Sequence, residues 1–358
     1  MDLALEALQA RIRAAAQAGT ALRIRGGGTK DFYGGALTGD VIDTRVYAGI
    51  IDYEPTELVI TARAGTSLAA VESAMRARGQ MLAFEPPRFA EGGTLGGVVA
   101  SGLSGPRRPY AGAVRDLVLG LRVFDGAGQY LSFGGQVMKN VAGFDVARLM
   151  TGALGTLGLI TEISLKCLPL PKTESTVVFE CSADEAIRRV NEWAGQPLPL
   201  SGTCFHQGRL CVRLSGAQPA VAAAMAKLGG ATVNDGDAFW MKVRDHAHAF
   251  FVGAAASGTP LWRLSVKSTA PYTDLGGEQL IEWGGALRWL VSGERTDAQK
   301  VRQWATAQGG HATLFRATSK NVNVFQPLDE TLAGLHNKLK AVFDPQRIFN
   351  RGRLLEDA

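Results

Sequence analysis

The sequence predicts an α+β protein built from two domains. Its 358 residues are more than one domain of ordinary size contains. Between residues 26 and 158, short runs of β-forming residues alternate with helical segments and glycine turns. The stretch from about 172 to 320 has a different residue pattern. Pro169 and Pro171 interrupt the chain between these regions, so the second domain is expected to begin there.

The first region is expected to contain several strands and one clearly marked helix. The segment 66–79 opens on a Thr-Ser pair, repeats its apolar residues at helical spacing and ends at Gly79, which is the pattern of a capped helix. The sequence DGAG at 125–128 is typical of a hairpin turn. The expected strands are 21–25, 40–44, 57–65, 116–124 and 158–168.

The second region also mixes helices and strands. Helices are expected at 182–195 and 218–230, and strands at 209–216, 260–267 and 284–293. This alternation favours a compact sheet with βαβ-like passes, antiparallel returns and helices on one face. A last helix is expected to end near Phe343, followed by a turn at Asp344 and Pro345.

Composition and charge exclude several classes of protein. The 38 Lys and Arg residues give a formal net charge of +5 but are scattered along the chain, so we expect no nucleic-acid partner. No run of about 18 apolar residues occurs, and Asp2 and Glu6 stand where a signal peptide carries positive charge. We therefore expect a cytoplasmic protein without a membrane-spanning segment.

The sequence predicts no metal site. Its four cysteines lie far apart, which excludes the tight clusters of iron-sulfur and zinc sites. His246 and His248 are two residues apart, but no third ligand is obvious nearby.

Three consecutive glycines, Gly26 to Gly28, follow the first expected strand and precede Thr29 and Lys30. Glycine readily adopts positive φ, and successive backbone N–H groups in such a turn can bind a phosphate. The spacing matches neither the Walker A loop nor GxGxxG. The segment alone is equally compatible with a tight turn between strands and with a phosphate-binding loop.

A second glycine segment, 92–102, surrounds a helix of small residues, against which a flat or extended ligand could lie close to the backbone. With two further segments, the order of these motifs resembles the FAD-binding domain of the vanillyl-alcohol oxidase and p-cresol methylhydroxylase (PCMH) superfamily. The closing FDPQRIFNRGR at 343–353 is similar to that family's C-terminal motif, with Arg351 where Pro is usual. The segments that carry the resemblance are RGGGT at 25–29, GGTLGG at 92–97, Gly112 with DLVLGL at 116–121, and GALGTLGLITE at 152–162.

The resemblance implies a PCMH-type FAD-binding domain of two subdomains at 1–170, an α+β cap domain at 171–320, and a segment at 321–358 that packs back on the FAD domain. It further implies that 25–30 and 92–97 bind the pyrophosphate, that 101–116 line the ribityl and ring side, and that the strand from Gly155 contacts the adenine portion. The residues assigned to FAD in this way are Arg25, Gly26, Gly27, Gly28, Thr29, Lys30, Pro86, Gly92, Gly93, Thr94, Gly96, Gly97, Ser101, Gly102, Ser104, Gly112, Asp116, Gly155, Gly158, Ile160 and Asn350.

We expect this FAD to be non-covalent. Covalent attachment in the family uses His, Cys or Tyr at particular places, but the first loop here has Lys30 and Asp31 instead, and no His precedes His206.

Within the superfamily, 2-hydroxy acid dehydrogenases carry a metal-binding HxGDGNxH-like cluster that is absent here. The chain is therefore most similar to the FAD-binding E subunits of bacterial glycolate oxidase. The resemblance implies oxidation of glycolate, a 2-hydroxy acid, to glyoxylate together with a second FAD subunit, which bears the main substrate site, and an iron-sulfur subunit. Any membrane association, at the inner face, would come through these partners.

Two alternatives remain open. The chain could be a self-sufficient FAD-dependent dehydrogenase of another small alcohol or 2-hydroxy acid, with His311, Lys267 or Arg316 at the flavin. It could instead be a non-catalytic assembly subunit whose FAD is structural.

Overall fold

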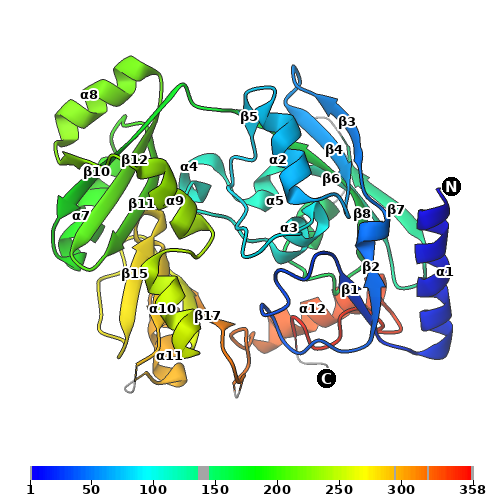
Figure 1. Ribbon diagram of the computed structural model, residues 1–358. Coiled ribbons are helices and arrows are strands. Elements are labelled where there is room, and N and C mark those ends of the chain that lie inside the picture. Colours follow the sequence, from blue (N-terminus) through cyan, green and yellow to red (C-terminus); the bar gives the residue numbers. More distant parts are fainter. Residues whose placement is uncertain (1, 136–144, 294–295, 321, 356–358) are drawn as a thin grey trace. The chain divides into compact units, whose positions relative to one another are not determined.

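The computed structural model describes residues 2–135, 145–293, 296–320 and 322–355. Its chain divides into two compact units (Figure 1). The first comprises Met1–Leu103, Gly112–Leu170 and Pro327–Ala358, and the second comprises Ser104–Ala111 and Pro171–Gln326. These units differ from the expected domains because residues 104–111 and 321–326 group with the second unit.

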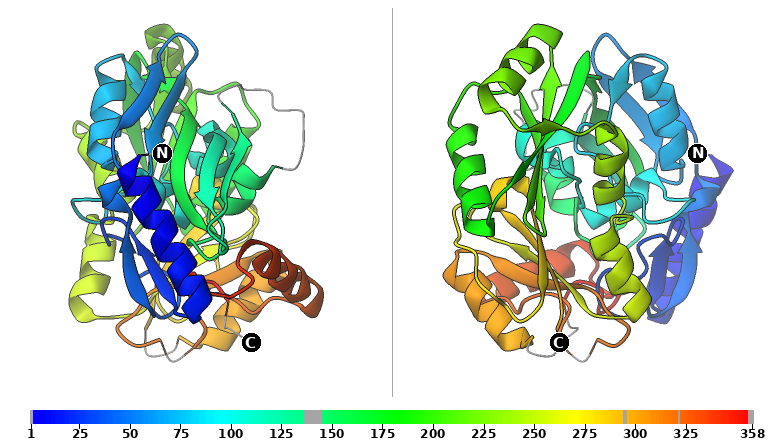
Figure 2. Two further views of the ribbon diagram at one scale, coloured as in Figure 1. Left: turned by 90° about the vertical axis from the view of Figure 1, so that its right-hand side faces the viewer. Right: turned by 60° about the vertical axis from the view of Figure 1, so that its left-hand side comes forward.

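A small parallel pair of strands begins the first unit. Strands β1 (Leu22–Arg25) and β2 (Asp40–Asp43) share a core with α1 (Leu3–Ala18), which runs alongside them in Figures 1 and 2. A short 3-10 helix, η1 (Thr44–Val46), follows β2. Leu22 also forms a parallel bridge with Phe349, so the C-terminal segment returns to the start of this unit.

A five-stranded antiparallel sheet forms the other part of the first unit. Its strands, in spatial order, are β3 (Ile50–Glu54), β4 (Val59–Arg63), β8 (Leu159–Lys166), β6 (Val118–Phe124) and β7 (Tyr130–Gly134). The expected hairpin at 125–128 joins β6 to β7. A two-stranded sheet pairs β5 (Gln80–Met81) with β9 (Leu168–Pro169). The helices of this part are α2 (Leu68–Arg76), α3 (Leu95–Ser101), α5 (Val114–Leu117), α6 (Val146–Met150) and α12 (Glu330–Phe343).

The second unit is built on an eight-stranded sheet whose neighbouring strands pair antiparallel. One half has the order β13-β10-β12-β11 and the chain order βαββαβ, which is the ferredoxin-like arrangement. Its elements are β10 (Thr173–Glu180), α7 (Ala183–Ala194), β11 (Leu200–His206), β12 (Arg209–Gly216), α8 (Gln218–Leu228) and β13 (Ala231–Thr232).

The other half continues the sheet through pairing of β11 with β15 and has the order β15-β16-β14-β17. Its elements are β14 (Leu261–Ser265), β15 (Glu278–Glu282), η2 (Trp283–Gly285), β16 (Leu287–Val291), α11 (Ala298–Ala307) and β17 (His311–Arg316). The unit also contains α4 (Arg108–Ala111), α9 (Gly236–Arg244) and α10 (Ala249–Ser257).

The expectation that helices cover one face of this sheet is wrong. Val212 of β12 packs in a core that also contains residues of α7 and α8. The next residue, Arg213, faces the other way and lies over the ring of Trp240 in α9. Both faces of the strand are buried, so both need a covering layer.

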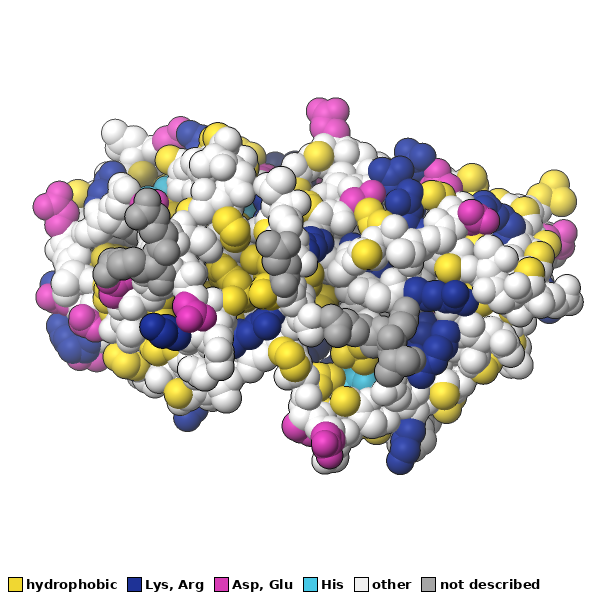
Figure 3. Space-filling model, turned by 90° about the horizontal axis from the view of Figure 1, so that it is seen from below, with side chains coloured by type: hydrophobic (Ala, Val, Ile, Leu, Met, Phe, Trp, Pro, Cys, Tyr) yellow, Lys and Arg dark blue, Asp and Glu magenta, His cyan; other side chains and the backbone are white. Residues whose placement is uncertain are grey.

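The charge distribution agrees with the sequence. Among the described residues on the face drawn in Figure 3, Lys and Arg side chains are interspersed with acidic and neutral ones and form no continuous stripe. Of the helices in the described part of the chain, none has the length and apolar character needed to cross a bilayer.

Candidate cofactor site

A pocket in the first unit collects most of the glycine motifs. It encloses about 820 Å³ of space not filled by protein, part of it open to solvent. Its lining residues are Ile24, Arg25, Gly26, Gly27, Gly28, Thr29, Lys30, Asp31, Leu37, Thr44, Ala64, Thr94, Gly96, Gly97, Ala100, Ser101, Leu154, Gly155, Gly158, Ile160, Asn350 and Arg353.

The loop that follows β1 forms one wall, and its glycines allow backbone to lie directly on backbone. A Cβ on Gly27 would stand 1.7 Å from the carbonyl oxygen of Gly92, so a side chain there has no room. Gly28 has a φ of +71°, which other residues adopt only at a cost. A Cβ on Gly28 would also meet the guanidinium of Arg25 at 2.4 Å.

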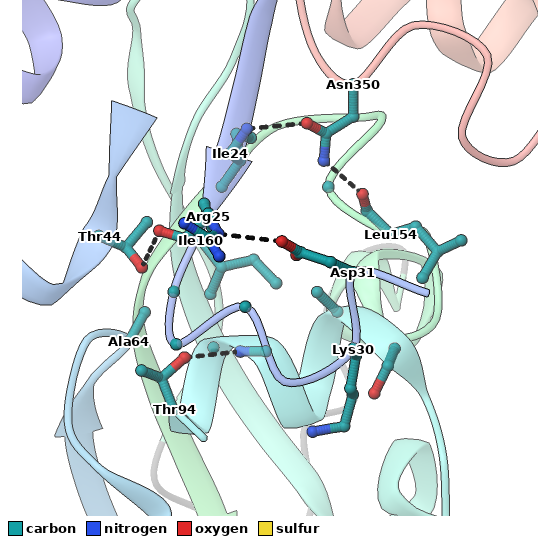
Figure 4. A pocket seen from close by; sticks show the side chains of 18 of the residues that line it. Ile24, Arg25, Lys30, Asp31, Thr44, Ala64, Thr94, Leu154, Ile160 and Asn350 are labelled. Atoms are coloured by element: carbon teal, nitrogen blue, oxygen red, sulfur yellow. Dashed lines mark hydrogen bonds and ion pairs between the residues drawn. The ribbon is translucent and has the colours of Figure 1, made fainter. Parts of the chain in front are cut away.

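A second wall comes from α3. Thr94 caps this helix, because its Oγ1 accepts a hydrogen bond from the Gly97 N–H at 3.3 Å (Figure 4). Gly96 lies against Ala64, whose carbonyl accepts from the Gly96 N–H at 2.8 Å. With Gly97 and Ala100 also on the pocket, this wall presents backbone and methyl groups.

Asn350 closes the pocket from the C-terminal segment. Its Oδ1 accepts a hydrogen bond from the Ile24 N–H at 2.8 Å, and its Nδ2 donates to the Leu154 carbonyl at 2.6 Å (Figure 4). The backbone N–H of Asn350 donates to the Leu22 carbonyl at 2.9 Å. One buried side chain therefore ties β1 to the turn that precedes β8.

The pocket carries an excess of positive charge. Burial lowers the pKa of Lys30 to about 8, and no ion pair to its ammonium group is found among the described residues. Arg25 and Asp31 form an ion pair with 3.0 Å between Nε and Oδ2. Burial also lowers the pKa of Arg353, whose guanidinium donates to the carbonyls of Asp31, Tyr33 and Gly35. An anionic group at this site would supply a counter-charge for Lys30.

The structure brings together about two thirds of the residues that the sequence assigned to the cofactor. Those that line the pocket are Arg25, Gly26, Gly27, Gly28, Thr29, Lys30, Thr94, Gly96, Gly97, Ser101, Gly155, Gly158, Ile160 and Asn350. The remaining residues do not line it: Pro86, Gly92, Gly93, Gly102, Ser104, Gly112 and Asp116.

Several of the remaining residues have other surroundings in the structure. Gly92 and Gly93 stand directly behind Gly27. Asp116 accepts a hydrogen bond from the Ala113 N–H at 2.9 Å, which closes the start of α5. Ser104 groups with the second unit. The segment at 139–144, where the fourth glycine segment begins, lies outside the described residues.

The three weak catalytic candidates belong to the second unit, and the structure does not place all of them together there. Exposed His311 pairs with Ser265 at one end of β14, next to exposed Lys267. Arg316 pairs with Leu261 at the other end of β14. These two ends of β14 are four residues apart, which is roughly 13 Å at 3.3–3.4 Å per residue.

Sequence reasoning missed several lining residues. Arg353 and Asp31 are the charged ones, and Ile24, Leu37, Thr44, Ala64, Ala100 and Leu154 complete the set. Arg353 had a signal in the sequence, because it ends the closing NRGR motif beside Asn350. The small apolar residues carried none, since many such residues in the chain lie elsewhere.

Comparison with known proteins identifies the pocket-bearing unit. Residues 4–134 match the family described as FAD binding domain. The chain is 47% identical over 349 residues to the glycolate oxidase subunit GlcE of Escherichia coli (strain K12), covering 98% of this chain and 97% of that protein. It is 33% identical over 130 residues to the glycolate oxidase subunit GlcD of Bacillus subtilis (strain 168), but that match covers 36% of this chain and only 27% of the relative.

A solved structure of alkyldihydroxyacetonephosphate synthase matches 96% of this chain and 74% of its own, with a TM-score of 0.65 and 14% sequence identity. At that identity the match concerns the fold alone. The fold, the pocket and the matched domain together define the class, an FAD-dependent oxidoreductase. More particularly, the chain belongs to the family of the glycolate oxidase subunit GlcE.

FAD is the cofactor that these matches indicate. The pocket fits such a group in two respects. The glycine loop after β1 and the α3 wall present backbone and small side chains, as a long ligand lying close to the chain requires. Lys30 and Arg25 contribute positive charge to the lining, which suits a ligand with an anionic group such as a pyrophosphate. Among the described residues that line the pocket there is no Cys, His or Tyr.

Proposed function

We propose that this chain is the FAD-binding subunit of a glycolate-oxidising complex, which converts glycolate to glyoxylate. The observation that carries the proposal is its end-to-end similarity to a relative named as a glycolate oxidase subunit, at 47% identity over 98% of this chain. The name of that relative makes it one subunit of an assembly. The proposed partners of this chain are a second FAD subunit and an iron-sulfur subunit.

The proposal places the main substrate site on the partner flavoprotein. The family resemblance assigns the metal-binding cluster to that longer subunit, and this sequence has no matching segment. Within the second unit, His311 and Arg316 lie at opposite ends of the same strand pair. These two side chains would therefore not act together on one small hydroxy acid within this unit.

The role of this chain's own residues is to bind and orient the cofactor. When bound, FAD supplies a two-electron acceptor for the oxidation of an alcohol. The glycine loop at 26–28 and the wall of α3 give it a close backbone surface, and Lys30 supplies a positive charge for its phosphates. Asn350 holds β1 and the turn at Leu154 together through one side-chain amide.

The lining of the pocket supports non-covalent binding, because the residue types used for covalent attachment in the family are not among the described residues that line it. The proposal places the complex in the cytoplasm. Any association with the inner face of the membrane would come through the partner subunits.

The test compares the isolated chain with the reconstituted complex. Each would be supplied with FAD, and glycolate-dependent reduction of a dye acceptor would be measured anaerobically. We expect turnover by the complex, whereas glycolate should leave the flavin of the isolated chain oxidised. Turnover by the isolated chain at the rate of the complex would contradict the subunit assignment and favour a self-sufficient dehydrogenase.

A second measurement addresses the role of the FAD. A Lys30→Met chain, depleted of FAD, would be assembled with the same partners, with Lys227→Met on the exposed part of α8 as the matched control. Assembly without turnover would support a place for this flavin in electron transfer. Full turnover of an assembled complex that lacks FAD in this chain would favour a structural cofactor.

A further inference from the structure

Lys340 is a buried cation on a helix that is otherwise largely exposed. It is the one buried residue of α12, a helix that the structure describes from end to end, and its side chain is 10% exposed. Its Nζ donates to three oxygens on three segments: the Thr156 carbonyl at 2.7 Å, the Asp344 Oδ2 at 2.6 Å and the Phe349 carbonyl at 3.0 Å. These bonds use all three protons of the ammonium group.

Asp344 is the counter-charge and is itself fully buried. Besides Lys340, its carboxylate accepts hydrogen bonds from the Ile348 N–H at 3.0 Å and the Phe349 N–H at 2.8 Å. Gly126 lies so close that a Cβ there would meet Asp344 Oδ1 at 2.4 Å. The segment between Asp344 and Phe349 is therefore closed around a buried ion pair.

Two of the three oxygens that Lys340 binds belong to segments whose neighbouring residues line the cofactor pocket. Thr156 lies between Gly155 and Gly158, which both line the pocket, and Phe349 immediately precedes Asn350. Gly155 and Asn350 are in close approach, since a Cβ on Gly155 would stand 2.8 Å from the Asn350 Nδ2. Lys340 itself does not line the pocket. It therefore joins these two segments from outside the pocket.

We propose that Lys340, together with Asp344, is a positioning residue of the cofactor site that sets FAD affinity by fixing the turn at 154–158 against Asn350. The inference rests on the proposed location of FAD in this pocket and is independent of glycolate as substrate. The hydrogen bond from Asn350 to the Leu154 carbonyl requires the 154–158 turn to stay close to Asn350. Lys340 maintains this distance through its bond to the Thr156 carbonyl. Stability alone is a weak reason for such a pair, because apolar residues of similar size often stabilise a core as well as a buried ion pair does.

The test is a double-substitution cycle of Lys340→Met and Asp344→Asn, with each variant purified and stripped of FAD. Each single substitution leaves the other group's charge buried without its partner, so both singles should lower the melting temperature. The double substitution removes both charges and should recover part of the loss, although the Thr156 and Phe349 carbonyls still lack a donor. FAD affinity should not recover with it, because a methionine side chain at position 340 has no donor for the Thr156 and Phe349 carbonyls.

FAD titration followed by flavin fluorescence, together with the visible spectrum of the bound flavin, gives the readout. We expect the double variant to bind FAD about tenfold more weakly than the wild type, since it loses hydrogen bonds from a charged donor at the pocket wall. Its flavin spectrum should shift as well. Ile12→Val, on the buried face of α1 in the core of the same unit, is the control: it should lower the melting temperature without changing FAD affinity or spectrum.

The outcomes separate this inference from the proposed site. If the double variant binds FAD as the wild type does, Lys340 has a structural role only and the inference is overturned. If instead Lys30→Met and Asn350→Ala, both at the pocket, leave FAD affinity unchanged, the site itself is misplaced. Lower affinity in the pocket variants and in the double variant, with an unchanged Ile12→Val, supports both.

Discussion

Gly27 lies against the backbone of Gly92, so closely that a Cβ on Gly27 would stand 1.7 Å from the Gly92 carbonyl oxygen. Two loops that are far apart in the sequence thereby meet behind the cofactor pocket. The triple glycine is thus required by packing between loops as well as by the left-handed backbone of Gly28. A tight turn between strands is ruled out, because residues 26–39 form a long connection between the parallel strands β1 and β2. Phosphate binding by this loop stays a prediction.

Gly27→Ala should therefore disrupt the pocket from behind. The added methyl group cannot be accommodated without moving the loop at Gly92, and overpacking of this kind costs about 1–3 kcal/mol or more. We expect a lower melting temperature and loss of FAD from the purified protein, measured by thermal unfolding and by the flavin absorbance per chain.

Gly93→Ala is the matched control. A Cβ there would meet only the Thr29 Oγ1, at 3.5 Å, and Gly93 has no positive φ. The fold should therefore persist. The resemblance assigns Gly93 to the pyrophosphate, so this variant should bind FAD more weakly at an unchanged melting temperature. Unchanged affinity would remove Gly93 from the cofactor contacts.

The glycine positions are visible in the sequence, but their assembly into one site was predicted from the family resemblance that their order carries. Asn350 could be placed there only through the resemblance, since its bond to Ile24 spans 326 residues. Covering of both sheet faces in the second unit could not be predicted. Arg213 has the pattern of a polar, solvent-facing residue of a strand, yet it is buried over Trp240.

The grouping of residues 104–111 with the second unit could also not be predicted from local sequence patterns. Arg107 makes two hydrogen bonds to the carboxylate of Glu174, at 2.9 and 3.0 Å, and the Gly105 carbonyl accepts from the indole N–H of Trp283. These partners come from distant parts of the chain, and no local signal links them. A single domain boundary at residue 170 therefore does not account for residues 104–111, which group with the second unit.

FAD affinity should depend on pH through Lys30. Burial lowers the pKa of Lys30 to about 8 in the FAD-free protein, and the phosphates of FAD favour its charged form. Affinity is therefore greatest below pH 8 and falls as the pH rises through that value. For a single group of this pKa, binding at pH 9 should be about tenfold weaker than at pH 7, as measured by FAD titration at both values.

Two substitutions identify the titrating group. Lys30→Met should bind FAD weakly at both pH values and lose most of the difference between them. Lys30→Arg keeps its charge over this range, so its affinity should vary little from pH 7 to pH 9. A wild-type pH dependence that persists in Lys30→Met would assign the effect to another group.

The flavin should be released by denaturation. The described residues that line the pocket include no Cys, His or Tyr, and Lys30 occupies the first loop. After precipitation of the FAD-loaded protein with acid, we expect all of the yellow flavin in the supernatant. Flavin absorbance in the washed pellet, or a mass increase of the intact denatured chain equal to one FAD, would contradict non-covalent binding.

Substitutions of Asn350 can separate the effect of its strained backbone from the effect of its side-chain hydrogen bonds. Its φ is +42°, a left-handed value that costs an ordinary residue about 1–2 kcal/mol, and its side chain bonds to Ile24 and Leu154. Asn350→Gly removes both bonds while tolerating this backbone, whereas Asn350→Ala removes them and adds strain. Both variants should lose FAD affinity to a similar degree, because the same two walls are released. Only Asn350→Ala should lose a further ~1 kcal/mol of unfolding free energy, measured by denaturant titration without FAD. If Asn350→Gly retained wild-type affinity, the side-chain bonds would not set the pocket, and the backbone conformation at Asn350 would be its main contribution.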